Sequence, residues 1–253
     1  MNWQKRGGQH IHWGSPSLHL TSGLRRRIAV VQPYVSFRGK RVLDIGCGTG
    51  IFLKSFKKLG ARAYGVDIDR KKIRKVPFAV YGNAEQLPFK DEIFDIVWSH
   101  EVLEHVDDDK KAAVESFRVL KPGGYLIVFA PNRAWPFETH GIYVGKKYIF
   151  GNIPLIPWLP KWMTRRLTPH VRNYTNKQLR SLFLGGKVIL HKHVYPGFDK
   201  LSRHSKALGQ ILQFFFHNLE RRFHHLGISH VLIVQKPKRN PIARSDLVFL
   251  GHN

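Results

Sequence analysis

Three glycines at alternate positions follow a short apolar segment near the start of the chain. Residues 42–45 read Val-Leu-Asp-Ile, and the next five read Gly-Cys-Gly-Thr-Gly. Glycine lacks a Cβ, so its backbone can turn sharply and approach a ligand closely. A helical pattern begins directly afterwards at Ile51, and the N–H groups of such a loop and helix start favour a carboxylate or phosphate. The segment therefore predicts a binding loop for a small molecule.

Two carboxylates accompany this loop. Asp44 precedes it, and Asp67 stands at the end of the next apolar segment, 21 residues after Gly46. A carboxylate at that place can accept hydrogen bonds from both hydroxyls of a ribose. Dinucleotide-binding proteins share glycine-rich loops, but their spacing is G-x-G-x-x-G, whereas this chain has G-x-G-x-G. The pattern predicts a ligand that contains a nucleoside.

Alternating strands and helices must position these residues. The strands read as continuous apolar runs, which is typical of a parallel sheet covered on both faces. Helices are expected at 18–34, 51–59, 108–120, 175–184 and 202–226, and strands at 41–45, 63–66, 78–81, 94–98, 125–130, 188–194 and 229–234. The fold class expected is α/β: a Rossmann-like, doubly wound, mostly parallel seven-stranded sheet.

The alternation predicts one domain over residues 40–236, preceded by a basic arm and helix (1–39) and followed by a basic tail (237–253). Residues 131–173 interrupt it with many Pro, Trp and Tyr residues, which predicts a lid or cap inserted after strand five. Within that segment, residues 142–166 mix aromatic residues with Lys and Arg. Such a mixture suits a membrane interface, a cap over the substrate, stacking on exposed bases, or a folded lid with its own small core.

The chain is strongly basic, with 42 Lys and Arg against 17 Asp and Glu and a net charge of +25. Such a field attracts nucleic acid, anionic lipid or phosphorylated glycan, unless it reflects a generally basic proteome. Cys47 is the single cysteine, so an internal disulfide is excluded. The N-terminus lacks the apolar segment of a secretory signal, and no apolar run reaches the ~18 residues of a membrane-spanning helix. We expect a cytoplasmic protein that contacts a membrane surface peripherally.

Five segments in order resemble class I S-adenosylmethionine-dependent methyltransferases, and within that family the type 11 subfamily. The glycine loop matches the first motif, and the further matches are Gly65-Val-Asp-Ile-Asp, Gly82-Asn-Ala-Glu-Gln-Leu-Pro-Phe, residues 94–106 and residues 120–126. The resemblance covers residues 40–130. It implies S-adenosyl-L-methionine as cofactor, and it implies donor contacts from Asp44, Gly46, Gly48, Gly50, Asp67, Ile68, Asn83, Ala84 and His100.

The resemblance also bears on Glu101, Glu104 and His105, whose spacing would place them on one face of a helix. In some quinone and RNA ribose methyltransferases, a similar Glu-x-x-Glu-His binds a divalent metal, which lowers the pKa of the attacking hydroxyl. Many type 11 proteins carry this segment without a known metal. We favour a structural or substrate-lining role and assign no metal.

Histidines supply the expected catalytic groups. His140 follows strand five in Phe-Glu-Thr-His and suits a general base near pH 7. His105 is the second candidate, and His170 has the same standing as His140, although surface or capping roles remain open for both. Cys47 is expected to be a small loop filler. Cytosine C5 methylation is excluded because it uses a cysteine after strand four, where this sequence has none.

The expected reaction is direct methyl transfer to a hydroxyl of a lipophilic or glycosylated small molecule. RNA ribose methylation is the alternative that the net charge keeps open. Methylation of base amines is disfavoured, because Ser99-His-Glu-Val stands where such enzymes carry Asn/Asp-Pro-Pro-aromatic. A non-catalytic donor-binding module is the third hypothesis. The sequence fixes neither the acceptor, nor its attacking atom, nor the oligomeric state.

Overall fold

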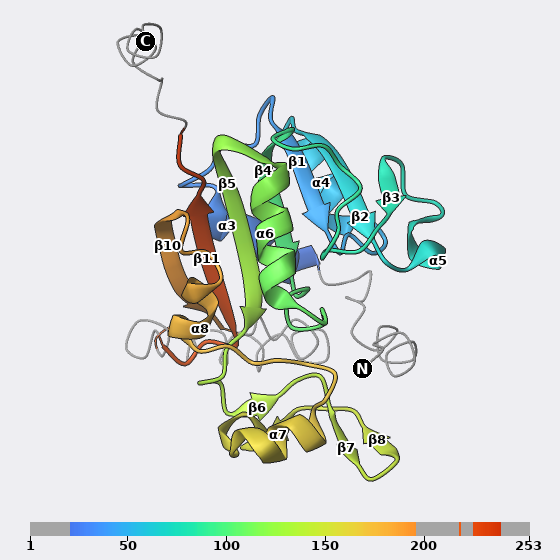
Figure 1. Cartoon of the computed structure of the whole chain (residues 1–253), viewed down its shortest axis with the longest axis vertical. Helices are drawn as coiled ribbons and strands as arrows, with labels where there is room; N and C mark the ends of the chain where they lie inside the picture. The colour runs from blue at the N-terminus through green and yellow to red at the C-terminus, as the bar shows by residue number, and fades with distance from the viewer. Residues whose placement is uncertain (1–20, 196–217, 219–224, 239–253) are drawn as a thin grey trace, which may run out of the picture.

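A seven-stranded sheet forms the centre of the molecule, in the order β10-β11-β5-β4-β1-β2-β3 (Figure 1). The computed structural model describes residues 21–195, 218 and 225–238. The strands are β1 Arg41–Ile45, β2 Arg62–Asp67, β3 Ala79–Tyr81, β4 Phe94–His100, β5 Leu120–Pro131, β10 Lys187–Val194 and β11 Ser229–Gln235. This confirms the predicted α/β class and the seven strands.

The sheet is parallel except at β11, which runs antiparallel to both of its neighbours, β5 and β10. Parallel pairing joins β3, β2, β1, β4 and β5. The carboxyl ends of these strands therefore meet at one edge of the sheet, which is where open α/β folds bind their ligands.

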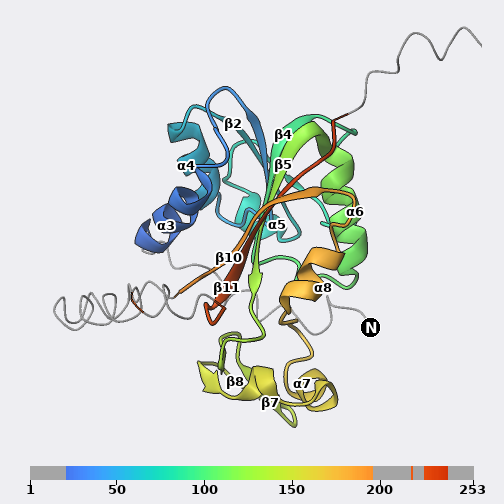
Figure 2. The same ribbon diagram turned by 90° about the vertical axis from the view of Figure 1, so that its left-hand side faces the viewer.

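Helices cover both faces of the sheet, as the edge-on view shows (Figure 2). On one side lie α3 Thr21–Val31 and α4 Ile51–Lys58, and on the other lie α6 Asp109–Val119 and α8 Asn176–Ser181. The short helix α5 Arg70–Ile73, which sequence patterning did not predict, follows β2. The central strands are buried from both faces, with Trp98 and Ile127 covered on one face and Val97 and Leu126 on the other.

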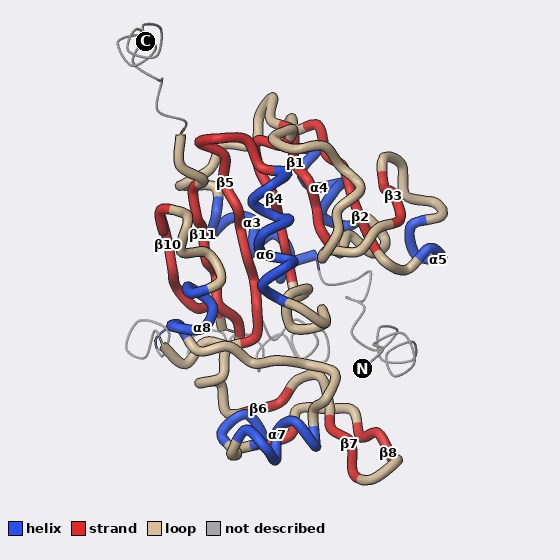
Figure 3. Tube along the Cα trace, viewed as in Figure 1, coloured by secondary structure: helices blue, strands red, loops and turns tan. Residues whose placement is uncertain are grey.

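The segment after β5 leaves the sheet and folds into small elements of its own (Figure 3). Strand β6 Phe137–Glu138 pairs with β9 Ile153–Pro154, and β7 Ile142–Val144 pairs with β8 Lys147–Ile149. A 3-10 turn, η1 Ile156–Trp158, and helix α7 Lys161–Leu167 follow. The two ends of the segment are tied together, because Tyr174 N–H donates to Pro131 O and Arg133 N–H donates to Tyr174 O, each at 2.9 Å.

Element boundaries follow the capping chemistry. Asp108 caps α6 by accepting from Lys110 N–H and Lys111 N–H, and Thr175 caps α8 in a reciprocal capping box with Gln178. Helix α6 ends at Val119, one residue before the predicted end, and α8 ends at Ser181, three residues before its predicted end. The predicted helix 202–226, the N-terminal arm to residue 20 and the tail from 239 lie outside the described residues, apart from positions 218, 225 and 226. No helix in the described part of the chain is long and apolar enough to cross a membrane.

Candidate functional site

The glycine loop lies between β1 and α4 and is tied to the end of β2. Gly46, Gly48 and Gly50 all have positive φ angles, of 70°, 51° and 74°. A Cβ on Gly46 would lie 2.4 Å from a methyl carbon of Val102, whereas a Cβ on Gly48 would meet no atom within 4 Å. The loop therefore needs glycine for its backbone, and Gly48 borders open space that a side chain would fill.

The loop amides differ from the sequence expectation. The N–H groups of Gly46 and Cys47 donate to Val66 O, that of Gly48 to the Asp67 carboxylate, and that of Gly50 to Cys47 O. These four donors are committed to the protein, so anion binding by N–H groups at this edge stays a prediction for the start of α4. The loop can cradle a ligand through its Cβ-free surface instead. Cys47 is buried and packs over Gly65, as expected of a loop filler.

Asp44 is the one acidic residue buried directly beneath this loop. Its side chain is 1% exposed, and its Oδ2 atom has no hydrogen-bond partner. Burial raises the pKa of the Asp44 carboxyl well above its usual value, and the nearby Asp67 carboxylate raises it further. A buried acceptor without a donor costs about 1–3 kcal/mol. A cationic ligand group would supply the missing partner.

Asp67 lies at the end of β2, as predicted for a ribose-binding carboxylate. Its Oδ2 accepts from Gly48 N–H at 2.7 Å and its Oδ1 from Asp69 N–H at 2.8 Å. Each carboxylate oxygen has a further lone pair, so these bonds leave acceptor capacity for hydroxyls. The carboxylate thus links the glycine loop to the turn that begins α5, and ribose binding stays a prediction.

The remaining residues expected at the donor lie around the same edge. Ile68 is half-buried beside Asp67. Asn83 is exposed after β3 with its side-chain oxygen accepting from Glu85 N–H, and Ala84 is half-buried. The ring of His100 packs between Phe52 and Phe129, with centroid distances of 4.9 and 5.2 Å. Burial lowers the pKa of His100 to about 3, so it is neutral at physiological pH.

The segment after β4 is a turn, so the helical arrangement considered for Glu101, Glu104 and His105 is wrong. Glu101 has a φ of 55°, which a residue other than glycine rarely adopts, and its carboxylate accepts from Ser229 Oγ at 2.6 Å. Burial opposes ionisation of Glu101, but His100, His140 and Arg27 and the Ser229 bond outweigh it and lower its pKa to about 2. Glu101 is therefore the ionised member of this acidic pair.

Glu104 is the other member, and its carboxyl is fully buried without a hydrogen-bond partner on either oxygen. Burial raises its pKa well above the usual value, and the neighbouring Glu101 charge adds to the effect. His105 lies 3.9 Å from Glu104, between its Nε2 and the carboxyl Oε1. His105 Nδ1–H donates to His170 O at 3.2 Å, which leaves Nε2 as the acceptor. Burial lowers the pKa of His105 to about 4.

His140 completes this group and is held by a carboxylate. Its Nδ1 lies 3.1 Å from Glu138 Oε1, and its ring centroid lies 5.3 Å from that of His105. Glu138 is 1% exposed and accepts a second bond from Asn173 at 2.8 Å. Burial alone would lower the pKa of His140, but the hydrogen bond and charge of Glu138 reverse the sign and raise it. The structure thus brings the two predicted catalytic histidines together.

The lid contributes this histidine and is anchored to the turn after β4. Arg172 donates to Val106 O and Asp107 O, and the Tyr174 hydroxyl donates to Leu103 O at 2.9 Å. His170 Nε2 donates to His140 O at 3.3 Å. These contacts hold the Glu138–His140 pair against Glu104 and His105. His170 therefore supports the site, because its side chain donates to the backbone carbonyl of His140, the candidate base.

Sequence reasoning missed Glu138, Asn173 and Ser229. Glu138 had a readable signal, because it precedes His140 by two positions and a carboxylate commonly orients a catalytic imidazole. Asn173 and Ser229 reach the site only through the return of the lid and the antiparallel placement of β11. Their side chains are 35 and 128 positions away from their partners.

Comparisons with known proteins agree with this geometry. Residues 43–128 match the family model described as "Methyltransferase domain". The ubiquinone biosynthesis O-methyltransferase of Maricaulis maris is 35% identical over 177 residues, covering 66% of this chain and 65% of the relative. That of Bartonella bacilliformis is 34% identical over 49% of this chain and 52% of the relative. The chain spans between about half and two thirds of the curated relatives it matches first.

Solved structures show the same fold at low identity. An S-adenosylmethionine-dependent methyltransferase from Mesorhizobium loti has a TM-score of 0.56 at 15% identity, covering 85% of this chain and 96% of its own. One from Archaeoglobus fulgidus has a TM-score of 0.54 at 22% identity, covering 85% and 92%. Residues 43–128 are therefore similar to a methyltransferase domain. Its family model is of type 11, in agreement with the resemblance.

The methyltransferase domain implies S-adenosyl-L-methionine, and the residues present fit this donor. Its methionine end carries an ammonium group, which matches the buried, partnerless Oδ2 atom of Asp44. The open space beside Gly48 admits a ligand against the backbone. Asp67 retains acceptor capacity for ribose hydroxyls. A donor bound there would place its methionine end at the carboxyl ends of β1 and β4.

The buried Asp44 gives a first prediction. An exposed aspartate has a pKa of ~3.9, whereas burial raises the pKa of Asp44 in the folded protein. The folded protein therefore loses stability relative to the unfolded chain as pH rises. We expect Asp44→Asn to raise Tm at pH 8 more than at pH 5, and to weaken donor binding by about tenfold. Thermal unfolding and calorimetry measure the two effects. Asp107→Asn, at an exposed carboxylate, is the matched control, and a uniform loss of Tm in Asp44→Asn would contradict the prediction.

Asp67 gives a second prediction. Asp67→Ala removes bonds to ribose and should weaken donor binding by at least ~tenfold, or ~1.4 kcal/mol. Asp69→Ala is the control, because Asp69 caps α5 through Lys71 N–H and Lys72 N–H and belongs to the same turn. Calorimetry with S-adenosylmethionine compares the two. Equally weakened donor binding in both variants would show that Asp67 acts only by stabilising the turn and does not bind the ribose.

Proposed function

We propose that this protein transfers the methyl group of S-adenosylmethionine to a hydroxyl of a lipophilic small molecule. The observation that carries the proposal is the Glu138–His140 pair, held beside Glu104 and His105 at the edge where β1, β4 and β5 end. A neutral imidazole oriented by a carboxylate can take the proton of a hydroxyl as it attacks. The sulfonium methyl is already activated, so the remaining task is alignment.

The two histidines have different tasks in this mechanism. His105 has a lowered pKa and stays neutral near pH 7, whereas His140 has a raised pKa and can hold the proton it receives. Glu138 accepts from His140 Nδ1–H, which directs the Nε2 lone pair away from Glu138 and stabilises the imidazolium. The catalytic proton would therefore rest on His140 Nε2. Water exclusion by the lid would strengthen each of these interactions.

The same side chains fit a divalent metal, which would be the alternative way to activate the hydroxyl. Glu104, His105 and His140 each offer one ligand atom within 4.8 Å of the others. Both imidazoles donate Nδ1–H to an oxygen and keep Nε2 as acceptor, as metal-binding histidines do. A metal there would lower the pKa of the acceptor hydroxyl. Activity that survives EDTA supports the proton mechanism, and activity lost to EDTA and restored by Mg²⁺ supports the metal.

The lid and the relatives together favour a lipophilic acceptor. The two relatives described above are named as ubiquinone biosynthesis O-methyltransferases. The lid exposes large apolar side chains, with Trp162 at 69%, Leu155 at 56% and Trp158 at 54% exposure. Exposed cations lie among them, at Lys146, Lys147, Lys161, Arg165 and Arg166. We infer that this face of the lid rests on an anionic membrane and receives the acceptor from it.

RNA ribose methylation is the second candidate, favoured by the net charge of +25. It requires the same activation of a hydroxyl, so the catalytic group does not separate the two. Radiolabelled donor offered to lipid and RNA extracts separates them by the fraction that gains label. Label in the lipid fraction supports the proposal, and label in RNA alone would replace it.

The raised pKa of His140 gives a pH prediction. The base acts when deprotonated, so the rate should fall as pH decreases through the pKa of His140. Glu138→Gln removes the charge that raises this pKa, so the acidic limb should shift to lower pH while kcat falls by about tenfold or more. Rates against pH, with a lipophilic phenol as acceptor, measure the shift. His170→Gln removes an imidazole that donates to the His140 carbonyl and packs against Tyr143 and Tyr148, but it leaves the Glu138–His140 pair in place and should not move the limb.

Two results would contradict the assignment of the acidic limb to His140. A limb that stays unmoved in Glu138→Gln, or that persists in His140→Gln, would show that another group titrates. His140→Gln is expected to remove at least ~99% of the activity, since a positioned base contributes 10²-fold or more.

The lid surface gives a prediction about membranes. We expect the protein to sediment with phosphatidylcholine vesicles that contain phosphatidylglycerol, and to be released by salt. The combined substitutions Trp162→Ser, Arg165→Gln and Arg166→Gln should weaken binding at least ~tenfold, because each cation near an anionic surface contributes about 1 kcal/mol. Leu184→Ser is the control, at a site outside the lid that is 84% exposed. Equal weakening in the control, or equal binding to neutral vesicles, would contradict the proposal.

A further inference from the structure

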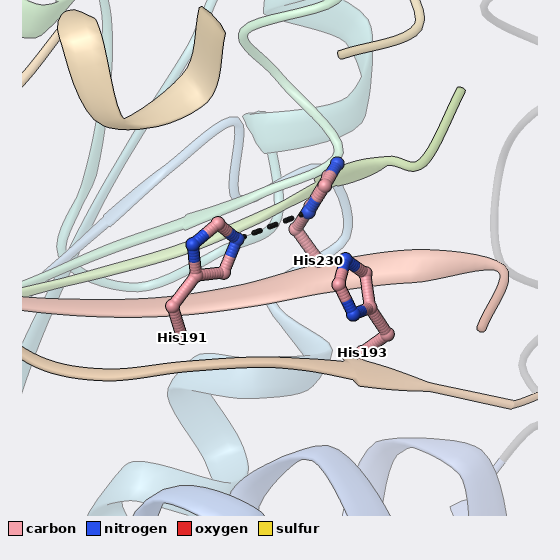
Figure 4. Close-up of side chains that lie close together, drawn as sticks. All are labelled: His191, His193 and His230. Carbon is pink, nitrogen blue, oxygen red and sulfur yellow. Dashed lines mark hydrogen bonds between the residues drawn. The ribbon is translucent and has the colours of Figure 1, made fainter. Parts of the chain in front are cut away.

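Three histidines gather on β10 and β11 at one side of the sheet (Figure 4). His191 and His193 lie on β10 and, being two positions apart, project from the same face. His230 lies on β11 directly opposite His193. The ring centroids of His193 and His230 are 4.7 Å apart, and those of His191 and His230 are 5.2 Å apart. Neither the donor loop nor the candidate base uses these residues.

Hydrogen bonds fix the proton positions in two of these rings. The Arg180 Nε–H, which can only donate, lies 2.8 Å from His191 Nδ1, so that nitrogen is an acceptor. His191 Nε2–H then donates to His230 Nδ1 at 3.1 Å, and His230 Nε2–H donates to the carbonyl of Tyr174 at 2.8 Å. Both imidazoles are neutral in this chain of bonds. Neutral imidazole is the form that binds metal ions.

The spacing of the nitrogens suits a small divalent cation. Each of the three histidines offers one nitrogen, and these atoms all lie within 4.8 Å of one another. A tetrahedral zinc ion with Zn–N bonds of ~2.0–2.1 Å separates its ligand nitrogens by about 3.3 Å. His191 Nε2 and His230 Nδ1 are already 3.1 Å apart. A zinc ion between them would take the place of the proton that they share. His193 would need to move only a short distance to bind it.

We propose that His191, His193 and His230 form a zinc-binding site. Three imidazoles with no carboxylate among them suit Zn²⁺ and exclude Mg²⁺ and Ca²⁺, which prefer oxygen ligands. The His230 Nε2–H bond to the Tyr174 carbonyl would persist and orient that ring, as an outer-shell partner does. His193 is 5% and His230 0% exposed, so two of the three proposed ligands are buried. Asn176 Oδ1 accepts from His193 Nε2–H at 2.9 Å and orients that ring, and a water would complete the coordination.

Arg180 opposes zinc binding by His191. The Arg180 guanidinium lies against His191 and would repel a zinc ion. Its Nε–H also donates to His191 Nδ1, which is the nitrogen that must carry the ring proton when His191 Nε2 binds zinc. Arg180 is exposed on α8 and can move into solvent. Removing the Arg180 charge should therefore tighten zinc binding. If the three histidines formed only a chain of hydrogen bonds, removing Arg180 would instead weaken that chain.

The site would act on the hinge of the lid. The Tyr174 carbonyl that accepts from His230 also accepts from Arg133 N–H, where the two ends of the lid meet. Ser229, adjacent to His230 in the chain, donates to Glu101 in the candidate active site. A zinc ion that joins β10 to β11 would therefore fix both the lid hinge and the strand that orients Glu101. Its role would be structural, because it would cross-link β10 to β11 beside the two ends of the lid.

The test uses the full chain without a polyhistidine tag, stripped with EDTA and titrated with ZnCl₂. We expect about one zinc per chain to survive gel filtration, measured by mass spectrometry of the metal, and Tm to rise on zinc addition. His191→Gln and His193→Gln should each weaken zinc binding at least ~tenfold. Arg180→Gln should tighten it. Cobalt in place of zinc should give the visible absorption of a tetrahedral site, and His193→Gln should lose that absorption.

The control variant is His140→Gln, which removes a ligand from the other candidate cluster. It should keep zinc and its Tm response, independently of any effect on methyl transfer. Zinc lost in His140→Gln but kept in His191→Gln and His193→Gln would overturn the proposal by assigning the metal to the other cluster. Absence of retained zinc in the natural chain, or weaker zinc binding in Arg180→Gln, would also overturn it.

Discussion

The structure depends on parallel pairing of β1, β2, β4 and β5, because this pairing brings every candidate functional group to one edge. Asp44 is the penultimate residue of β1, Asp67 ends β2, and the turn with Glu101 and Glu104 follows β4. Asp44, Asp67 and the turn with Glu101 and Glu104 are far apart in sequence, yet the parallel pairing of their strands brings them to the same edge. The lid can leave the fold only after β5, so its histidine also arrives at that edge.

A second constraint is the burial of acidic groups at this edge in a chain that is otherwise strongly basic. Asp44 and Glu104 are buried without hydrogen-bond partners, which costs stability unless a proton or ligand neutralises them. Glu101 and Glu138 avoid the cost, because Ser229, His140 and Asn173 hold their charges. The two uncompensated groups lie where a cationic donor and a proton or metal would bind. Local instability is therefore concentrated where ligands would relieve it.

The sequence predicted the sheet and the glycine loop well, because local periodicity and loop chemistry determine both. It predicted His105 and His140 by residue type and position, and the structure brings them together. It could not predict Ser229 or Asn173, which reach the site through β11 and the end of the lid. The helical spacing of Glu101, Glu104 and His105 failed for a physical reason. Glu101 takes a positive φ and its carboxylate accepts from Ser229, and a residue with positive φ cannot lie within a right-handed helix.

The antiparallel strand β11 connects the two clusters of histidines and acids. Neighbouring residues on a strand face opposite sides of a sheet, and here Ser229 bonds to Glu101 while His230 bonds to His191 and to the Tyr174 carbonyl. A shift of this strand by one residue would exchange these two partners and disrupt both clusters at once. Both clusters therefore require the observed register of β11 against β5 and β10. This explains why polar residues occupy buried positions at the start of a strand whose remaining buried positions are aliphatic.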